Sequence, residues 1–184
     1  MLALRDFFAA RPMLRFTLIA VALYLGWIVG YEQILGPNNG LDRTLSAQVA
    51  TSAAALLRGV GFAAHVTSLA PPTVSLAGQP AVFVGDPCNG LVLYALFAGF
   101  VLAFPGPLRH KLWFMPTGIF LIFGLNALRV AVLALNHAYW YHTVEFNHHY
   151  TFTFVAYGFI FGLWMLWVKR LAGPVGNIIA VQHG

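Results

Sequence analysis

Charged side chains are scarce in this sequence. They make up only 8% of its 184 residues, and only five residues are acidic. A water-soluble domain averages about 25% charged residues, because its surface must be solvated. The chain is instead 60% hydrophobic, with a mean hydropathy of +0.77. This composition excludes a soluble globular enzyme and a disordered chain, and it indicates an integral membrane protein.

Cysteine is almost absent as well. The single Cys88 has no second cysteine with which to pair, so a disulfide-stapled fold is excluded. The formal net charge of +5 is compatible with nucleic-acid binding, but basic residues scattered along a membrane protein ordinarily set its topology. We therefore expect membrane lipid around this chain and no nucleic-acid partner.

Long apolar runs are abundant. A membrane-spanning helix needs about 20 apolar residues, and the sequence contains four runs of that kind. They cover residues 14–35, 89–104, 112–136 and 150–171. The sequence therefore predicts an all-α integral membrane fold, a four-helix transmembrane bundle that forms a single membrane domain over residues 1–184.

The basic residues predict the orientation of these spans. They stand before the first span, between the second and third, and at the end of the fourth: Arg5, Arg11, Arg15, Arg109, Lys111, Lys169 and Arg170. Because basic residues collect on the cytoplasmic side, both termini are expected to be cytoplasmic. The loops at residues 36–88 and 137–149 then face outward, which is the periplasm if the chain lies in a bacterial inner membrane.

The first outer loop is long enough to have structure of its own. Residues 42–60 are alanine-rich with apolar residues near helical spacing, which predicts a helix at the outer interface. Three short β-like segments are expected next, at residues 66–69, 73–76 and 81–84, because turn residues separate them.

Two glycine pairs lie within the predicted spans. Gly26 and Gly30, like Gly158 and Gly162, have the spacing that lets membrane helices approach closely. They predict packing seams, either inside the bundle or between subunits of a homo-oligomer or a complex with a partner membrane protein.

Arg129 lies inside the otherwise apolar third span. A charged side chain there costs a few kcal/mol even on lenient insertion scales, so it indicates a functional site. Asn126 precedes it by three residues and shares its helical face. Alternatively, Arg129 snorkels outward or pairs with Asp86 or Glu145 for packing alone.

Cys88 stands at the predicted outer end of the second span. Pro87 suits the first position of a helix and Asp86 suits the cap before it, so we expect the thiol in the first helical turn. The helix dipole there favours the nucleophilic thiolate, although the Asp86 carboxylate opposes it. The alternative is an inert, buried cysteine.

Four histidines belong to the second outer loop and the start of the fourth span: His137, His142, His148 and His149. A histidine beside a cysteine is a general base for a nucleophile, whereas several histidines together suit a metal. Their spacing matches no strong metal signature. Since the predicted topology brings Cys88, Arg129 and His148 or His149 to one membrane level, we favour catalysis.

At these residues the sequence resembles the exosortase and archaeosortase family of membrane cysteine transpeptidases, over about residues 80–170. The Cys-Ser-Gly block of that family resembles Cys88-Asn89-Gly90, its Asn-x-x-Arg block resembles residues 126–129, and its later histidine resembles His148-His149. Asn89 replaces the usual serine. The family commonly has more spans than four, so this chain resembles a compact member.

The resemblance implies that Cys88 attacks a peptide bond and forms a thioester. It implies that His149, or its neighbour His148, acts as acid and base, and that Arg129 stabilises the oxyanion or orients the substrate. Asn126 and Asn89 would contact the substrate, a secreted protein with a C-terminal sorting motif, one hydrophobic span and a basic tail. No metal or organic cofactor is implied.

Two other functions compete with catalysis. The first is a non-catalytic membrane subunit or assembly factor, in which Arg129 is structural and Cys88 is merely buried. The second is a cytochrome-type anchor with histidine haem ligands. It is disfavoured because His148 and His149 share one predicted helix and the other spans offer no clear partner.

Overall fold

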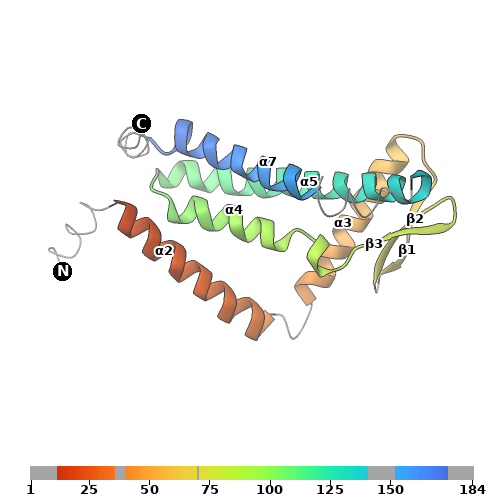
Figure 1. Cartoon of the computed structure of the whole chain (residues 1–184), viewed down its shortest axis with the longest axis horizontal. Helices are drawn as coiled ribbons and strands as arrows, with labels where there is room; N and C mark the ends of the chain where they lie inside the picture. The colour runs from red at the N-terminus through yellow and green to blue at the C-terminus, as the bar shows by residue number, and fades with distance from the viewer. Residues whose placement is uncertain (1–11, 36–39, 70, 141–151, 174–184) are drawn as a thin grey trace. The chain divides into compact units, whose positions relative to one another are not determined.

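The computed structural model describes residues 12–35, 40–69, 71–140 and 152–173, which are mostly helical with one small sheet (Figure 1). The elements in chain order are α2 (Pro12–Trp27), η1 (Ile28–Leu35), α3 (Gly40–Gly59), β1 (Ala64–Leu69), β2 (Pro72–Leu76), β3 (Gln79–Phe83), η3 (Asp86–Cys88), α4 (Leu91–Ala103), α5 (Leu108–Tyr139), α7 (Phe152–Leu166) and η6 (Trp167–Leu171).

Three helices in the described part of the chain are long and apolar enough to cross a membrane. They are Met13–Tyr31, Leu108–Tyr139 and Phe152–Leu171, which confirms helices at the first, third and fourth predicted spans. The second predicted span forms the 13-residue helix α4. At 1.5 Å per residue α4 is about 20 Å long, against a hydrocarbon core of about 30 Å. A complete second span, and with it a four-span bundle, stays a prediction.

The ends of α4 and α5 are set by local chemistry. Pro105, Gly106 and Pro107 separate the two helices, and proline cannot donate the backbone hydrogen bond that would continue α4. On the far side of this break, α5 runs for 32 residues, or about 48 Å. It is therefore longer than the hydrocarbon core of a membrane.

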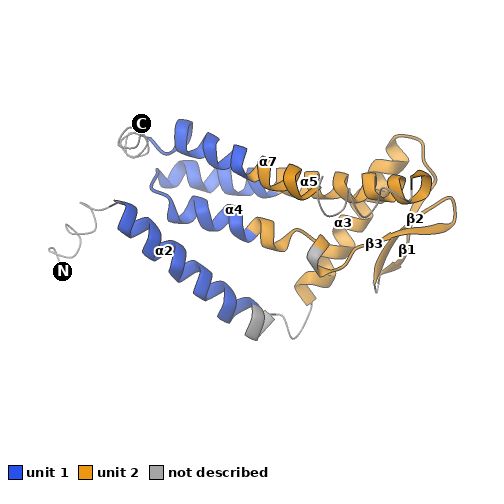
Figure 2. Cartoon of the chain, viewed as in Figure 1, with its two compact units in different colours: residues 1–37, 95–119, 161–184 blue, residues 38–94, 120–160 orange. Residues whose placement is uncertain are grey.

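The described residues cluster into two compact units, coloured in Figure 2. Unit 1 takes its residues from Met1–Pro37, Ala95–Ile119 and Phe161–Gly184, and unit 2 from Asn38–Tyr94 and Phe120–Ile160. Helices α4, α5 and α7 are each divided, with one segment in unit 1 and the other in unit 2. The prediction of a single membrane domain stays a prediction.

Aromatic rings fill unit 1. Phe100 stacks on Trp164 with ring centroids 4.6 Å apart, and Phe114 packs against the fully buried Trp167 at 5.3 Å. Gly118 lies directly against the ring of Phe97, where a Cβ atom would overlap the ring. Close packing of large rings therefore holds the parts of α4, α5, α7 and η6 that belong to this unit together.

Unit 2 contains the sheet, which has the antiparallel order β1-β2-β3. Ser75 of β2 pairs with His65 of β1, and the register shifts once within each strand pair. Ala77 and Gly78, with φ of 49° and 82°, form the two-residue turn between β2 and β3. Such a turn, with positive φ at both residues, matches the right-handed twist of the strands it joins.

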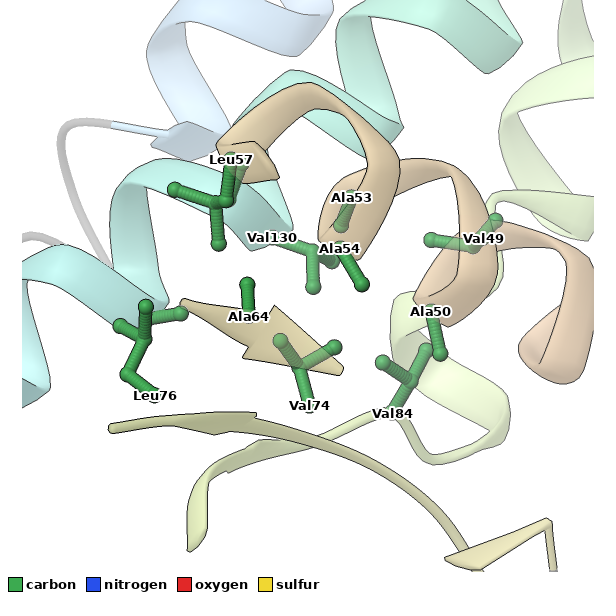
Figure 3. Packing of buried hydrophobic residues seen from close by; sticks show 12 residues of the cluster. Val49, Ala50, Ala53, Ala54, Leu57, Ala64, Val74, Leu76, Val84 and Val130 are labelled. Carbon is green, nitrogen blue, oxygen red and sulfur yellow. The ribbon is translucent and has the colours of Figure 1, made fainter. Parts of the chain in front are cut away.

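Helix α3 covers the sheet and completes the core of unit 2 (Figure 3). Its alanine-rich face brings Ala53, Ala54 and Leu57 against Ala64 and Val74 of the strands. Three α5 residues join this cluster: Val130, Ala131 and Ala134. The predicted helix and β-like segments of the first loop are thus confirmed as elements. Their position at the outer face of a membrane stays a prediction.

The two glycine pairs have open space at their Cβ positions. A Cβ atom at Gly26, Gly30, Gly158 or Gly162 would have no neighbouring atom within 4 Å among the described residues. The packing seams, either internal or between subunits, stay a prediction.

Candidate functional site

Cys88 lies in a short turn ahead of α4, within unit 2. Residues 86–88 form a single 3-10 turn, and the backbone N–H of Cys88 donates to the Gly85 carbonyl at 2.9 Å. Helix α4 begins only at Leu91, and Gly90 between them has a φ of 85°. The prediction that Cys88 lies in the first turn of the spanning helix is therefore wrong, because a left-handed residue breaks the helix there.

The predicted cap is also wrong. Residue 85 caps the 3-10 turn, and no side chain makes a capping hydrogen bond there. Asn89 makes a hydrogen bond at the start of α4 instead, since its Oδ1 accepts the backbone N–H of Leu91, the first residue of that helix, at 2.9 Å. Because the field of a helix dipole falls off within about one turn, its effect on the Cys88 thiol is weaker than the sequence suggests.

Asn89 is fully buried, and both ends of its amide are hydrogen-bonded. Its Nδ2 donates to Asp42 Oδ1 at 2.6 Å while its Oδ1 accepts from Leu91. The Tyr94 hydroxyl in turn donates to the Asn89 carbonyl oxygen at 3.3 Å. This geometry favours a positioning role for Asn89 over the substrate contact that the resemblance implies.

Asn126 joins α5 to the Cys88 turn. Its side chain is only 3% exposed, and its Nδ2 donates to the Cys88 carbonyl oxygen at 2.8 Å. Since Nδ2 is used in this way, Oδ1 is the remaining polar atom, and it is buried without a hydrogen-bond partner among the described residues. The structure thus brings together two motifs that lie 38 residues apart in the sequence.

Arg129 is half-buried one helical turn beyond Asn126. Its Nε is buried and has no hydrogen-bond partner in the described part of the chain. Arg129 and the exposed Asp86 form no ion pair there, and Glu145 lies outside the described residues. A buried donor without a hydrogen-bond partner costs about 1–3 kcal/mol.

Asn126 and Arg129 line a cavity of about 120 Å³. Its other walls are apolar and come from the first turns of α4 and α7 and from α5: Leu93, Ile122, Leu125, Leu128, Val132, Phe152, Val155 and Ala156. Asn126 Oδ1 and Arg129 Nε are themselves buried, so the surface that the cavity offers is almost entirely apolar. Such a surface complements an aliphatic side chain.

Of the remaining predicted site residues, the structure describes some and leaves the others outside its described ranges. Cys88 is half-buried and packs against the core of unit 2, and His137 lies half-buried in the last turn of α5. The other predicted histidines, His142, His148 and His149, lie outside the described residues. Within the described ranges, no three His, Cys, Asp or Glu side chains gather into a group that could hold a metal ion.

Sequence reasoning missed Asp42 and Tyr94. Asp42 is 2% exposed in the first turn of α3, and Tyr94 packs close to Gly90. One signal pointed to Asp42, because it is one of only five acidic residues and precedes an apolar helix pattern. Tyr94 gave no signal, since an aromatic residue near the end of a predicted span is ordinary.

A comparison with protein families identifies the chain. The family described as transmembrane exosortase matches residues 2–170. The chain belongs to this family. The match spans every described element from α2 to α7 and includes the Cys88 turn, the 126–129 motif and His148-His149. Comparison of this exosortase with curated proteins and with solved structures finds no match.

Gly90 makes the Cys88 turn of this exosortase possible. Its φ of +85° is one that L side chains rarely adopt. A Cβ atom there would also lie 2.9 Å from the Tyr94 hydroxyl oxygen and 3.3 Å from Asn126 Nδ2. The atom would therefore press on the same amide that donates to the Cys88 carbonyl.

We expect Gly90→Ala to destabilise the protein by about 1–3 kcal/mol, because it combines backbone strain with crowding at Asn126. Gly61→Ala is the matched control, since Gly61 has a φ of +93° and open space where its Cβ would lie. Thermal unfolding is measured for both variants. Equal losses of stability in the two variants would show that the crowding at Gly90 adds nothing to the backbone strain.

Proposed function

We propose that this exosortase is a membrane-embedded cysteine protease or transpeptidase that cleaves C-terminal sorting signals of secreted proteins. One observation carries the proposal: the hydrogen bond from Asn126 Nδ2 to the Cys88 carbonyl oxygen. It joins the only thiol of the chain to the helix that bears the intramembrane Arg129. Family membership supports the same reaction class.

The proposed reaction uses Cys88 as nucleophile. Its thiolate sulfur attacks the carbonyl carbon of the scissile peptide bond, and the carbonyl oxygen becomes an oxyanion that Arg129 stabilises. As the C–N bond breaks, His149 or His148 protonates the leaving amine and a thioester remains on Cys88. Water or an acceptor nucleophile, deprotonated by the same histidine, then attacks the thioester and releases the thiolate.

The cavity beside Arg129 supports a substrate that carries an aliphatic side chain. Its walls are almost entirely apolar, which favours such a side chain. Arg129 lies at the wall of this cavity, and its guanidinium is the group that we assign to the carbonyl oxygen of the bound peptide.

The distribution of charge supports a reaction at the outer face of a bacterial inner membrane. With the basic groups at the inner ends of the spans and both termini cytoplasmic, Cys88 and Arg129 come to the outer membrane level. A secreted protein still held by its C-terminal span presents its sorting motif at this level.

Hydroxylamine provides the test, because it attacks thioesters as an artificial acceptor. Membranes that contain the full chain and its host's secreted proteins are incubated with and without the reagent. We expect hydroxylamine to release proteins that have lost a C-terminal hydrophobic span and that end in a hydroxamate. If mass spectrometry finds no such products while other thioesters in the membranes react, the non-catalytic subunit becomes the better account.

A further inference from the structure

Asp42 is a buried carboxyl group far from Cys88 in sequence. It lies in the first turn of α3 and is 2% exposed, in a chain with only five acidic residues. Burying a carboxylate is costly unless the group is hydrogen-bonded. Its Oδ1 accepts the short 2.6 Å hydrogen bond from Asn89 Nδ2, and both side chains are buried.

This hydrogen bond fixes which way the Asn89 amide points. An ionised carboxylate can only accept hydrogen bonds, whereas an amide has a donor end and an acceptor end. Asp42 therefore requires Nδ2 of Asn89 to face it, which leaves Oδ1 to accept the N–H of Leu91. A neutral amide at position 42 would allow either orientation.

The fixed amide connects three parts of unit 2. Asn89 directly follows Cys88, and residue 42 lies 47 positions before it. The first turn of α3 is thus tied to the Cys88 turn and, through Leu91, to the first residue of α4. Asn126 holds the same turn from α5 by its bond to the Cys88 carbonyl.

We propose that Asp42 is a positioning residue, which orients Asn89 and thereby holds the thiol of Cys88 in its reactive placement. The assignment rests on the proposed function in that it takes Cys88 as the nucleophile. Asp42 acts through Asn89 and needs no contact with substrate. Its loss frees the turn between residues 85 and 91.

Exchange of the two partners tests this role. Asn89→Asp alone places two carboxyl groups against each other, whereas the double variant Asp42→Asn/Asn89→Asp restores a hydrogen bond of reversed direction. The readout is the alkylation rate of Cys88 by iodoacetamide at fixed pH in the purified full chain, because Cys88 is the only thiol. Thermal unfolding is recorded in parallel for each variant.

We expect Asn89→Asp and Asp42→Ala to raise the alkylation rate by about tenfold, because the half-buried thiol becomes accessible when the turn loosens. The double variant returns the rate to within about threefold of the wild type. Ser46→Ala is the matched control, since Ser46 is equally buried one turn along α3 and its Oγ has no hydrogen-bond partner among the described residues. It leaves the rate unchanged.

Two results would overturn the proposal. One is an alkylation rate in folded Asp42→Ala that equals that of Ser46→Ala. The other is a double variant whose rate is no closer to the wild type than that of Asn89→Asp. If Asn89→Asp fails to fold, the alkylation rates of Asp42→Ala and Asp42→Asn are each compared with that of Ser46→Ala. Rates equal to that of Ser46→Ala would again overturn the proposal. Since alkylation needs no substrate, failure of this proposal is distinguishable from failure of the hydroxylamine test.

Discussion

Cys88→Ser is expected to reduce the release of shortened proteins from membranes by about 10³-fold or more, because a serine hydroxyl is a far weaker nucleophile than a thiolate at neutral pH. The two side chains differ little in size, and the half-buried position tolerates either one. The free energy of unfolding is therefore expected to change by less than about 1 kcal/mol. Hydroxylamine-dependent release and thermal unfolding measure the two quantities in the same preparations.

The control for Cys88→Ser is Ser46→Ala, which also exchanges a small buried group in unit 2. It should release products at the rate of the wild type. Release by Cys88→Ser at that same rate would identify Cys88 as an inert residue packed against the core. The noncatalytic interpretation would then replace the enzymatic one.

Arg129→Leu is expected to lower the processing rate by about 10²- to 10³-fold, the loss typical of removing one oxyanion-stabilising group. It should leave the stability unchanged or raise it, because leucine fits the apolar cavity and the buried Nε without a partner among the described residues is removed. Arg129→Lys keeps the charge but loses the planar guanidinium, so its rate should fall between those of the wild type and Arg129→Leu.

Arg43→Leu controls for the loss of a positive charge, since Arg43 is an exposed residue of α3 in the same unit. Its processing rate should equal that of the wild type. The alternative for Arg129 is a structural ion pair. A variant Arg129→Leu that unfolds at a lower temperature yet processes normally would support that alternative, because breaking a buried pair destabilises the protein while leaving the chemistry intact.

The sequence was most informative about the helices. Within a membrane every backbone group must be hydrogen-bonded inside its own segment, so an apolar run of about 20 residues dictates a helix by itself. Helices α2, α5 and α7 therefore lie where the runs predicted them. Turn chemistry was equally local, since the glycine and proline residues between residues 66 and 84 predicted the breaks between the strands.

The same local reasoning failed at Cys88. Pro87 and Asp86 resemble a helix start, but the left-handed Gly90 separates their turn from α4. Gly90 can take this conformation because it has no Cβ, and the nearby Tyr94 and Asn126 leave no room for one. The turn at Cys88 therefore follows from the backbone conformation of Gly90, which Asn126 of α5 approaches closely.

The sequence by itself determined a membrane-embedded helical protein and the order of its chemical motifs, because composition and apolar run length act within each segment. Family membership agrees with those motifs. Only the tertiary structure decided that Asp42 holds Asn89, that Asn126 holds the Cys88 turn, and that Arg129 lines an apolar cavity. These contacts join residues 38 and 47 positions apart, and they depend on how separate helices pack rather than on any local pattern.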